Sequence, residues 1–223
     1  ISVVWTSRPV TERKMAPLDA IWTSEDATLV LASGSSVRTR LLTAAGVPHQ
    51  VEPANIDEGE VRDRLLAEDA SHDVIAEVLA ELKAQKVSER HPDAIVLGAD
   101  QILSCNGDLF EKPAGLEGVR AHLNALSGKS HTLHTSVCAI SAGDVIWHHN
   151  SGPKLRMRTF SDGFIDRYVE AAGLAVCETV GGYQMEGLGV HLFEEIEGDF
   201  YDILGLPMLP LLAFLRQQSM VLA

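Results

Sequence analysis

The chain has 223 residues, of which 46% are hydrophobic and 22% charged, a composition that allows one substantial core or two small lobes. Its formal net charge of −13 argues against a nucleic-acid-binding surface, because backbone phosphates need a basic protein face. Three widely spaced cysteines suit reduced thiols in the cytoplasm and no zinc site, and no apolar run approaches the ~18 residues of a membrane span.

Residues 1–27 are expected to be an N-terminal extension, either foreign to the protein or disordered in part, ahead of a single domain over residues 28–219. Residues 1–14 contain no hydrophobic segment long enough for a signal peptide. One hypothesis takes Met15 as the natural first residue, which the intact mass of the endogenous protein would test.

A short apolar strand, a Gly/Ser turn and a helix follow one another over residues 29–45. The strand is expected at Leu29–Leu31 and the helix from Arg38 to Ala45. Such a turn aims backbone N–H groups, two hydroxyls and the positive end of the helix dipole at one spot, which suits an anion. The alternative, that Ser35 or Ser36 is only the N-cap of the helix, has about equal weight on this pattern alone.

The next segment contains two features with alternative interpretations. A polar loop is expected at residues 55–58 after a short strand at 49–52, and its acids would either hold a divalent cation or, more commonly, lie in a solvated turn. Apolar residues at helical spacing predict a helix over residues 74–88. Lys83 lies at the border of its apolar stripe, so its ammonium either reaches solvent or lies in a cleft beside the core.

The apolar run over residues 94–103 is typical of a strand buried on both faces. Asp100 interrupts it at the end where open α/β sheets place their ligands, which favours a functional role for this acid above the others. Asn106-Gly107 predicts a hairpin turn, after which the chain returns to Lys112.

The remaining elements alternate helices with an antiparallel section. Helices are expected over residues 116–126, 162–172 and from 205–207 to 216, and strands over 133–140, 145–149, 154–160 and 190–193. Histidine pairs at 131/134 and 148/149 are disfavoured as metal ligands, because HxxH on a strand places its rings on opposite faces. The acidic run from Glu194 to Asp202 is typical of a solvated face. The order predicts an α/β fold with an elongated mixed sheet, flanking helices and two lobes around a cleft.

Seven short motifs, covering residues 29 to about 216, occur in an order that resembles the Maf family of nucleoside triphosphate pyrophosphatases, also called septum-formation inhibitor proteins. They read LASGSSVR, ELKAQK, LGADQ, FEKP, LSGKSH, GGYQMEGLG and EGDFYDILGLPMLPLL. The resemblance implies a cytoplasmic, dimeric enzyme with a fold related to the inosine-triphosphate pyrophosphatases. It further implies that a divalent cation, Mg²⁺ or Mn²⁺, assists in splitting a nucleoside triphosphate into monophosphate and pyrophosphate.

The resemblance also implies which residues bind the phosphates. Ser33, Ser35 and Arg38 match the family's phosphate-binding loop, where hydroxyls, amides and a guanidinium cradle a triphosphate. Lys83 and Lys112 match the family's lysines and supply local cations that an acidic chain needs near an anionic ligand.

Two acids complete the implied catalytic set of Asp100, Lys83, Lys112 and Glu58. Glu58 and Asp100 match the family's acids and are the implied metal ligands. Asp100 matches the proton acceptor, which would orient or deprotonate a water attacking the α-phosphorus.

Three positions associated with base choice in the family fall on Val37, Gln101 and Glu186. Gln101 and Glu186 resemble the branch that acts on 7-methyl-GTP, whereas the dTTP/UTP branch has threonine and glutamine there. A carboxylate at Glu186 suits guanine, whose N1–H and 2-amino group are adjacent donors. The sequence departs from the family at Ser36 and Val37, which replace a proline and a large residue, and Val37 removes a tryptophan that could stack on a methylated base.

The expected function is therefore metal-dependent hydrolysis of a nucleoside triphosphate, with 7-methyl-GTP or another purine as the expected substrate. Two alternatives stand beside it. The first keeps the reaction but takes dTTP or UTP as the substrate. The second is a nucleotide-binding regulator of cell division without turnover, against which the retention of Asp100, Lys83 and Lys112 argues.

Overall fold

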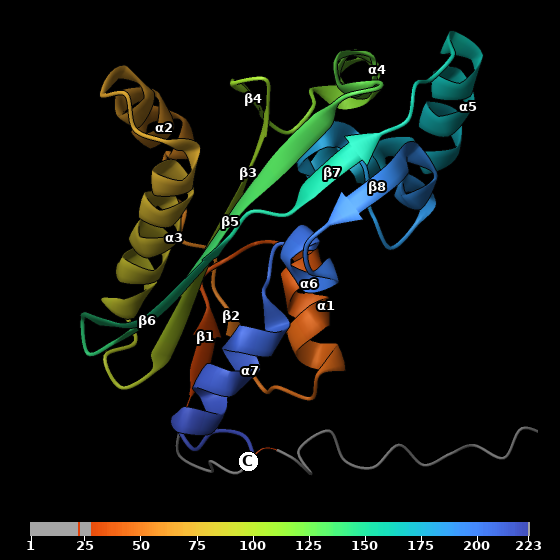
Figure 1. Ribbon diagram of the computed structural model, residues 1–223. Coiled ribbons are helices and arrows are strands. Elements are labelled where there is room, and N and C mark those ends of the chain that lie inside the picture. The colour runs from red at the N-terminus through yellow and green to blue at the C-terminus, as the bar shows by residue number, and fades with distance from the viewer. Residues whose placement is uncertain (1–21, 23–27, 223) are drawn as a thin grey trace, which may run out of the picture.

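The computed structural model describes Trp22 and residues 28–222, so the predicted extension over residues 1–27 lies outside the described residues except for Trp22. Trp22 forms an isolated antiparallel bridge with Val221. In this described part, an eight-stranded mixed sheet runs in the order β2-β1-β3-β5-β7-β8, with β4 paired to β3 and β6 paired to β5 (Figure 1). The α/β fold with an elongated mixed sheet is confirmed.

The two long strands, β3 and β5, run diagonally through the whole molecule in Figure 1. β1 is parallel to both β2 and β3, whereas β3 is antiparallel to β5 and β4, and β5 to β6 and β7. The strands are β1 Leu29–Leu31, β2 Gln50–Val51, β3 Ile95–Cys105, β4 Asp108–Phe110, β5 Ser130–Ser141, β6 Asp144–Ser151, β7 Lys154–Met157 and β8 Phe193–Glu197.

Helices flank this sheet, and three short 3₁₀ turns follow α5. The helices are α1 Ser36–Ala44, α2 Glu58–Ala67, α3 His72–Ser88, α4 Gly115–Leu126, α5 Asp162–Ala172, α6 Phe200–Ile203 and α7 Met208–Gln217, and the 3₁₀ turns are η2 Gly173–Glu178, η3 Val180–Gly182 and η4 Leu188–Leu192. No helix in the described residues is long and apolar enough to cross a membrane.

Three sequence-based expectations about these elements were wrong. Residues 55–58 are not all loop, because Asp57 caps α2 by accepting a hydrogen bond from the Glu60 backbone N–H and Glu58 is the first helical residue. The last predicted strand begins at Phe193, since residues 188–192 form η4 instead. The strand expected to reach residue 160 ends at Met157.

The hairpin turn was predicted correctly. Asn106 and Gly107 both adopt positive φ, 55° and 93°, as a two-residue turn of this kind requires, and they join β3 to β4.

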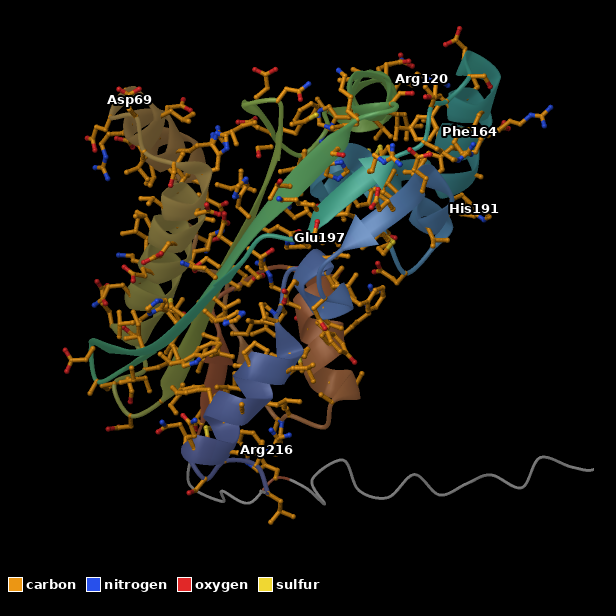
Figure 2. The ribbon with its side chains drawn as sticks, viewed as in Figure 1. Asp69, Arg120, Phe164, His191, Glu197 and Arg216 are labelled. Carbon is orange, nitrogen blue, oxygen red and sulfur yellow. The ribbon has the colours of Figure 1, made fainter. Side chains whose placement is uncertain are left out.

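Four hydrophobic clusters lie along the sheet in the described residues, and the two largest form the main cores of the fold. The first core contains Leu31, Leu97 and Phe214 and lies beneath α1 and α7, while α3 covers the opposite sheet face. The second core contains Leu103 and Val169 and lies beneath α4 and α5. Figure 2 shows the two ends of this arrangement, with Arg216 marking α7 and Phe164 marking α5. The two predicted lobes are therefore present and share β3 and β5.

Between the lobes, one edge of β3 has no paired strand among the described residues. Pairing with β1 ends at Leu31 opposite Leu97, and pairing with β4 starts at Leu103. Asp100 lies in the middle of this open stretch, and a cavity of about 720 Å³ lies against it. The cleft between the lobes thus forms where a short strand leaves a long one unpaired.

Candidate active site

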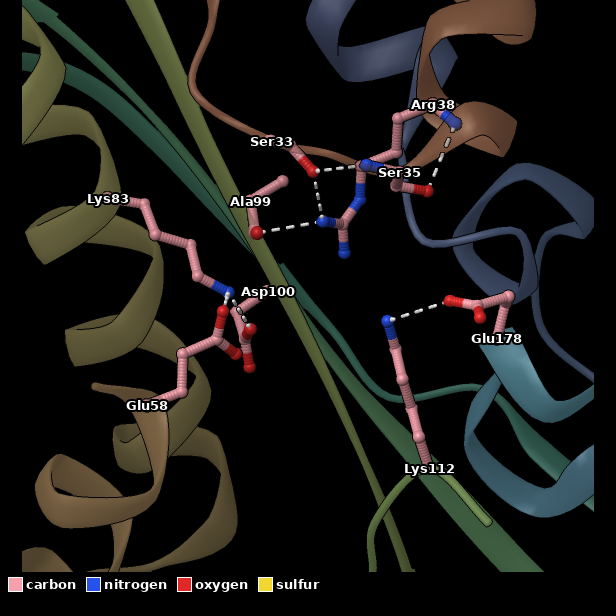
Figure 3. A network of polar contacts seen from close by, with 9 residues as sticks. All are labelled: Ser33, Ser35, Arg38, Glu58, Lys83, Ala99, Asp100, Lys112 and Glu178. Carbon is pink, nitrogen blue, oxygen red and sulfur yellow. Dashed lines mark hydrogen bonds and ion pairs between the residues drawn. The ribbon is translucent and has the colours of Figure 1, made fainter. Parts of the chain in front are cut away.

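Three charged side chains from different elements meet at the open edge of β3 (Figure 3). The Lys83 Nζ on α3 lies 2.6 Å from Asp100 Oδ1 and 2.9 Å from Glu58 Oε1 at the start of α2. Lys83 and Asp100 are buried, whereas the side chain of Glu58 is half exposed to the cavity. The Lys83 ammonium therefore lies in the cleft beside the core, which decides between the two alternatives for this residue.

Burial dominates the electrostatics of Asp100. Loss of hydration raises the pKa of this carboxyl, while the Lys83 ammonium and the Arg38 guanidinium oppose the rise. A buried carboxylate whose pKa is raised by burial, with an ammonium 2.6 Å away, is suited to accept a proton.

On the other side of the cavity, the side chain of Arg38 forms hydrogen bonds with three segments of the chain. Its Nη1 donates to Ser33 Oγ at 3.0 Å and to the Ala99 carbonyl at 2.9 Å, and its Nε donates to the Gly205 carbonyl at 2.8 Å. Ser35 is the N-cap of α1, accepting a hydrogen bond from the Arg38 backbone N–H at 3.4 Å. Ser35 thus caps α1 and also lines the cavity, so its capping role does not exclude a contact with a ligand.

Among the described residues, the Arg38 guanidinium makes three hydrogen bonds, all to uncharged acceptors. They use Nε and Nη1, and Nη2 takes part in none of these three. Burial lowers the pKa of Arg38, against the opposing effect of Asp100 and Glu58. A buried guanidinium whose three bonds reach only neutral groups at a cavity wall is well suited to an anionic ligand.

The residues expected to choose the base also line the cavity, on its α1 side. Val37 lies on the first turn of α1, and Gln101 donates through Nε2 to Thr135 Oγ1 at 2.8 Å and to the Asp202 carbonyl at 2.9 Å. Glu186 Oε1 pairs with Arg40 Nη2 at 2.8 Å. The protein therefore fixes Gln101 through its side-chain amide nitrogen, whereas Arg40 holds the Glu186 carboxylate at one oxygen.

Lys112, predicted to contact phosphates, follows β4 and lines the cavity opposite Arg38. Its Nζ lies 3.9 Å from Glu178 Oε2, and both side chains are largely exposed. Such a pair is weak, so the lysine is available to a more strongly charged partner.

Sequence reasoning missed Arg62, which lines the same cavity and pairs with Glu111. The signal was present: Asp57 followed three residues later by Glu60 is a helix N-terminus pattern. A helix starting there places Arg62 one turn after Glu58 on the same face.

The carboxylates of the site fit a divalent cation whose coordination is completed by the substrate. Within the described residues, no group of three or more His, Cys, Asp or Glu side chains converges as a metal site. Glu58 and Asp100 converge on one ammonium and both face the cavity. Because Mg²⁺ is usually held by one or two carboxylates plus substrate phosphates and water, these two residues fit that mode.

The sequence also resembles proteins of known family. Residues 28–218 match the Maf-like protein family. The chain is 50% identical over 190 residues to the nucleoside triphosphate pyrophosphatase of Paramagnetospirillum magneticum, covering 85% of this chain and 98% of that protein. It is 46% identical to the 7-methyl-GTP pyrophosphatase of Mesorhizobium japonicum, covering 84% and 94%, and 43% identical to that of Brucella abortus, covering 86% and 97%. The chain belongs to the Maf family.

Proposed function

We propose that this chain hydrolyses a nucleoside triphosphate to nucleoside monophosphate and pyrophosphate, with the help of Mg²⁺ or Mn²⁺. The enzyme class, nucleoside triphosphate pyrophosphatase, follows from family membership and from relatives of that name at up to 50% identity. The observation that best supports the reaction in this chain is the buried Lys83–Asp100 pair, which faces the buried Arg38 across one cavity.

In the proposed reaction, each of these residues has a separate role. Asp100 accepts a proton from a water whose oxygen forms a bond to the α-phosphorus, and the bond from that phosphorus to the bridging oxygen breaks. The departing pyrophosphate takes the electron pair. Lys83 holds the two carboxylates, while Arg38 and Lys112 bind phosphate oxygens. A divalent metal held by Glu58 and Asp100 would neutralise polyphosphate charge.

For the base, we propose a purine with guanine-like donors. Glu186 lines the cavity, and its second carboxylate oxygen does not take part in the 2.8 Å contact with Arg40. Two of the relatives described above are named 7-methyl-GTP pyrophosphatases, which supports guanine or a methylated guanine. A dTTP or UTP substrate is the alternative, and it predicts that Glu186→Gln improves rather than impairs turnover of those nucleotides.

The test is pyrophosphate release from 7-methyl-GTP, GTP, dTTP, UTP, CTP and ITP, with Mg²⁺ or Mn²⁺ and an EDTA control. We expect metal-dependent turnover that favours a guanine nucleotide, and a loss of 10²-fold or more in kcat for Asp100→Asn, the typical order of magnitude for removing a general base, about 10²–10⁴. Glu186→Gln is expected to lower kcat/KM for the guanine nucleotide.

Two outcomes would contradict the proposal. Turnover of Asp100→Asn within a few-fold of the unchanged protein would show that Asp100 is not the base. Folded protein that binds nucleotides without turnover would instead favour a regulator of cell division. We further propose that the chain forms a homodimer, which light scattering of the purified protein would test. We also propose a cytoplasmic location, which fractionation of the cells that produce the protein would test.

A further inference from the structure

A second pair of opposite charges lies at the α2 side of the cavity. Arg62, on the second turn of α2, contacts Glu111, the residue before Lys112. Both residues line the cavity. The side chain of Arg62 is 23% exposed and that of Glu111 is 62% exposed, so the arginine is held against the protein while the acid is largely in solvent.

The position of Arg62 follows from helix geometry. It lies four residues after Glu58, so the two side chains share one face of α2. Because Glu58 contacts Lys83 at 2.9 Å, this face is turned toward the catalytic cluster. Arg62 therefore extends the charged wall of the cavity one helical turn beyond that cluster.

The two ends of the cavity differ in what they offer a ligand. α1 packs on the face of β3 that carries Leu97 and Ala99, and it holds the Glu186 carboxylate through Arg40. α2 packs with α3 on the other face, against Ile102. In Figure 1, α1 and α2 lie on opposite sides of the two long strands. A nucleotide whose base lies at the α1 end would thus direct its terminal phosphates toward α2, the helix that carries Arg62.

Guanidinium recognises carboxylate and phosphate in the same way, through paired N–H donors that match two oxygens. The Glu111 carboxylate therefore contacts the Arg62 guanidinium in the way that a phosphate group would. We propose that Arg62 binds the pyrophosphate half of the substrate and the pyrophosphate product, and that Glu111 competes with these anions for the guanidinium. This inference rests on the proposed function for the identity of the ligand.

The competition predicts opposite effects for the two partners of the pair. Removing the Arg62 charge weakens pyrophosphate binding. Removing the Glu111 charge frees Nη2 of the guanidinium, leaves only the longer contact of its Nε with Asp63 Oδ1 at 3.6 Å, and strengthens binding. A contact that only fastens α2 to the segment after β4 would be broken equally by either change, and both variants would then shift binding in the same direction.

The experiment is titration calorimetry of magnesium pyrophosphate into the full chain and its Arg62→Gln, Arg62→Lys, Glu111→Gln and Arg64→Gln variants. Arg64 is the matched control, because it is an exposed arginine on the same helix and does not line the cavity. We expect Arg62→Gln to weaken binding about tenfold or more, as for a lost charge-assisted hydrogen bond. Arg62→Lys should be intermediate, Glu111→Gln should tighten binding about threefold or more, and Arg64→Gln should stay within about twofold.

The inference is overturned if Arg62→Gln and Glu111→Gln shift affinity in the same direction, or if Arg62→Gln weakens binding no more than Arg64→Gln. Calorimetry needs no turnover, so its result stands even if the nucleotide panel shows no hydrolysis. Conversely, turnover by the unchanged protein together with unaltered pyrophosphate affinity in Arg62→Gln would reject this inference alone and leave the proposed function intact.

Discussion

At the scale of single residues, the site contains three buried charged groups, Arg38, Lys83 and Asp100, and their partners differ. Asp100 has the Lys83 ammonium at 2.6 Å, whereas Arg38 makes its three guanidinium hydrogen bonds to neutral oxygens. A buried charge without a counter-ion is costly, and hydrogen bonds repay only part of that cost. The arrival of an anion would thus stabilise Arg38, whose only opposite charges are the Asp100 and Glu58 carboxylates acting without a hydrogen bond among the described residues.

His131 gives the first prediction at this scale. It is 2% exposed, its Nε2 lies 2.8 Å from the Tyr183 hydroxyl, and Tyr183 lines the cavity. Burial lowers the pKa of His131 from 6.5 to about 4. Between these values the unfolded chain binds the extra proton and the folded protein does not, so stability is present above pH 6.5 and is lost as the pH falls toward 4.

We expect the free energy of unfolding to fall by up to about 3 kcal/mol over that window because of His131, and His131→Gln to remove this part of the slope. Urea denaturation at a series of pH values measures it. His148→Gln, which alters an exposed histidine, is the control and should leave the slope unchanged. An equal slope in the His131→Gln variant would refute this assignment.

Single residues differ in how far sequence reasoning could place them. The phosphate-loop residues follow from local pattern, since a strand–turn–helix unit fixes its own geometry. Asp100 was expected at the end of a strand, but it lies inside β3, and it reaches the cavity because β3 has no paired strand on that edge among the described residues. The pairing of Arg40 with Glu186 joins positions 146 residues apart, and no local spacing encodes it. The contact of Arg62 with Glu111 was beyond reach for the same reason.

At the scale of elements, Gly98 determines how closely α3 approaches β3. A Cβ built on this glycine would lie 2.0 Å from the Ala80 carbonyl oxygen and 2.8 Å from the Ala84 Cβ, and both residues belong to α3. Lys83 lies on the same helix, so the missing side chain at residue 98 helps to bring its ammonium to Asp100.

Gly98→Ala is therefore expected to destabilise the fold by about 2–3 kcal/mol, as overpacking against backbone does, and to lower kcat by moving Lys83 away from Asp100. Chemical denaturation and turnover measure the two effects. Gly163→Ala is the matched control, because Gly163 lies in α5 with open space at its Cβ position, and it should be neutral or stabilising by up to about 1 kcal/mol. Equal effects of the two substitutions would contradict this account of Gly98.

Most elements could be predicted, and the one missed near the site shows the limit. α3, α4, α5 and the long strands have clear apolar periodicity or length. α2 is mostly polar, and only Leu65 among its residues is buried. A helix held by its cap and by packing along one narrow side carries little periodic signal, so α2 was not predicted beyond the loop expected at residues 55–58.

At the scale of the whole molecule, β3 and β5 connect the first core to the second. β3 contributes Leu97 to the first core and Leu103 to the second, and β5 contributes Val137 and Leu133 in the same way. The cavity lies between these cores and takes residues from both sides, with Ser33 and Arg38 on one and Lys112 and Glu178 on the other. A ligand that contacts both sides would couple the two lobes.

A non-hydrolysable nucleoside triphosphate with Mg²⁺ is therefore expected to stabilise the whole chain in one cooperative transition. At a concentration of 100 Kd the gain is about 2.7 kcal/mol, which corresponds to a rise in Tm of about 5–10 °C for a chain of this size. Two of the three tryptophans, Trp22 and Trp147, pack against the first core, so their fluorescence reports on it, while far-UV circular dichroism reports on both lobes. The two transitions should coincide and move together, because the strands that form one core continue into the other.

Arg38→Gln should remove most of the rise in Tm that the nucleotide causes. Two separate transitions, with only one responding to the nucleotide, would show that the ligand binds within a single lobe.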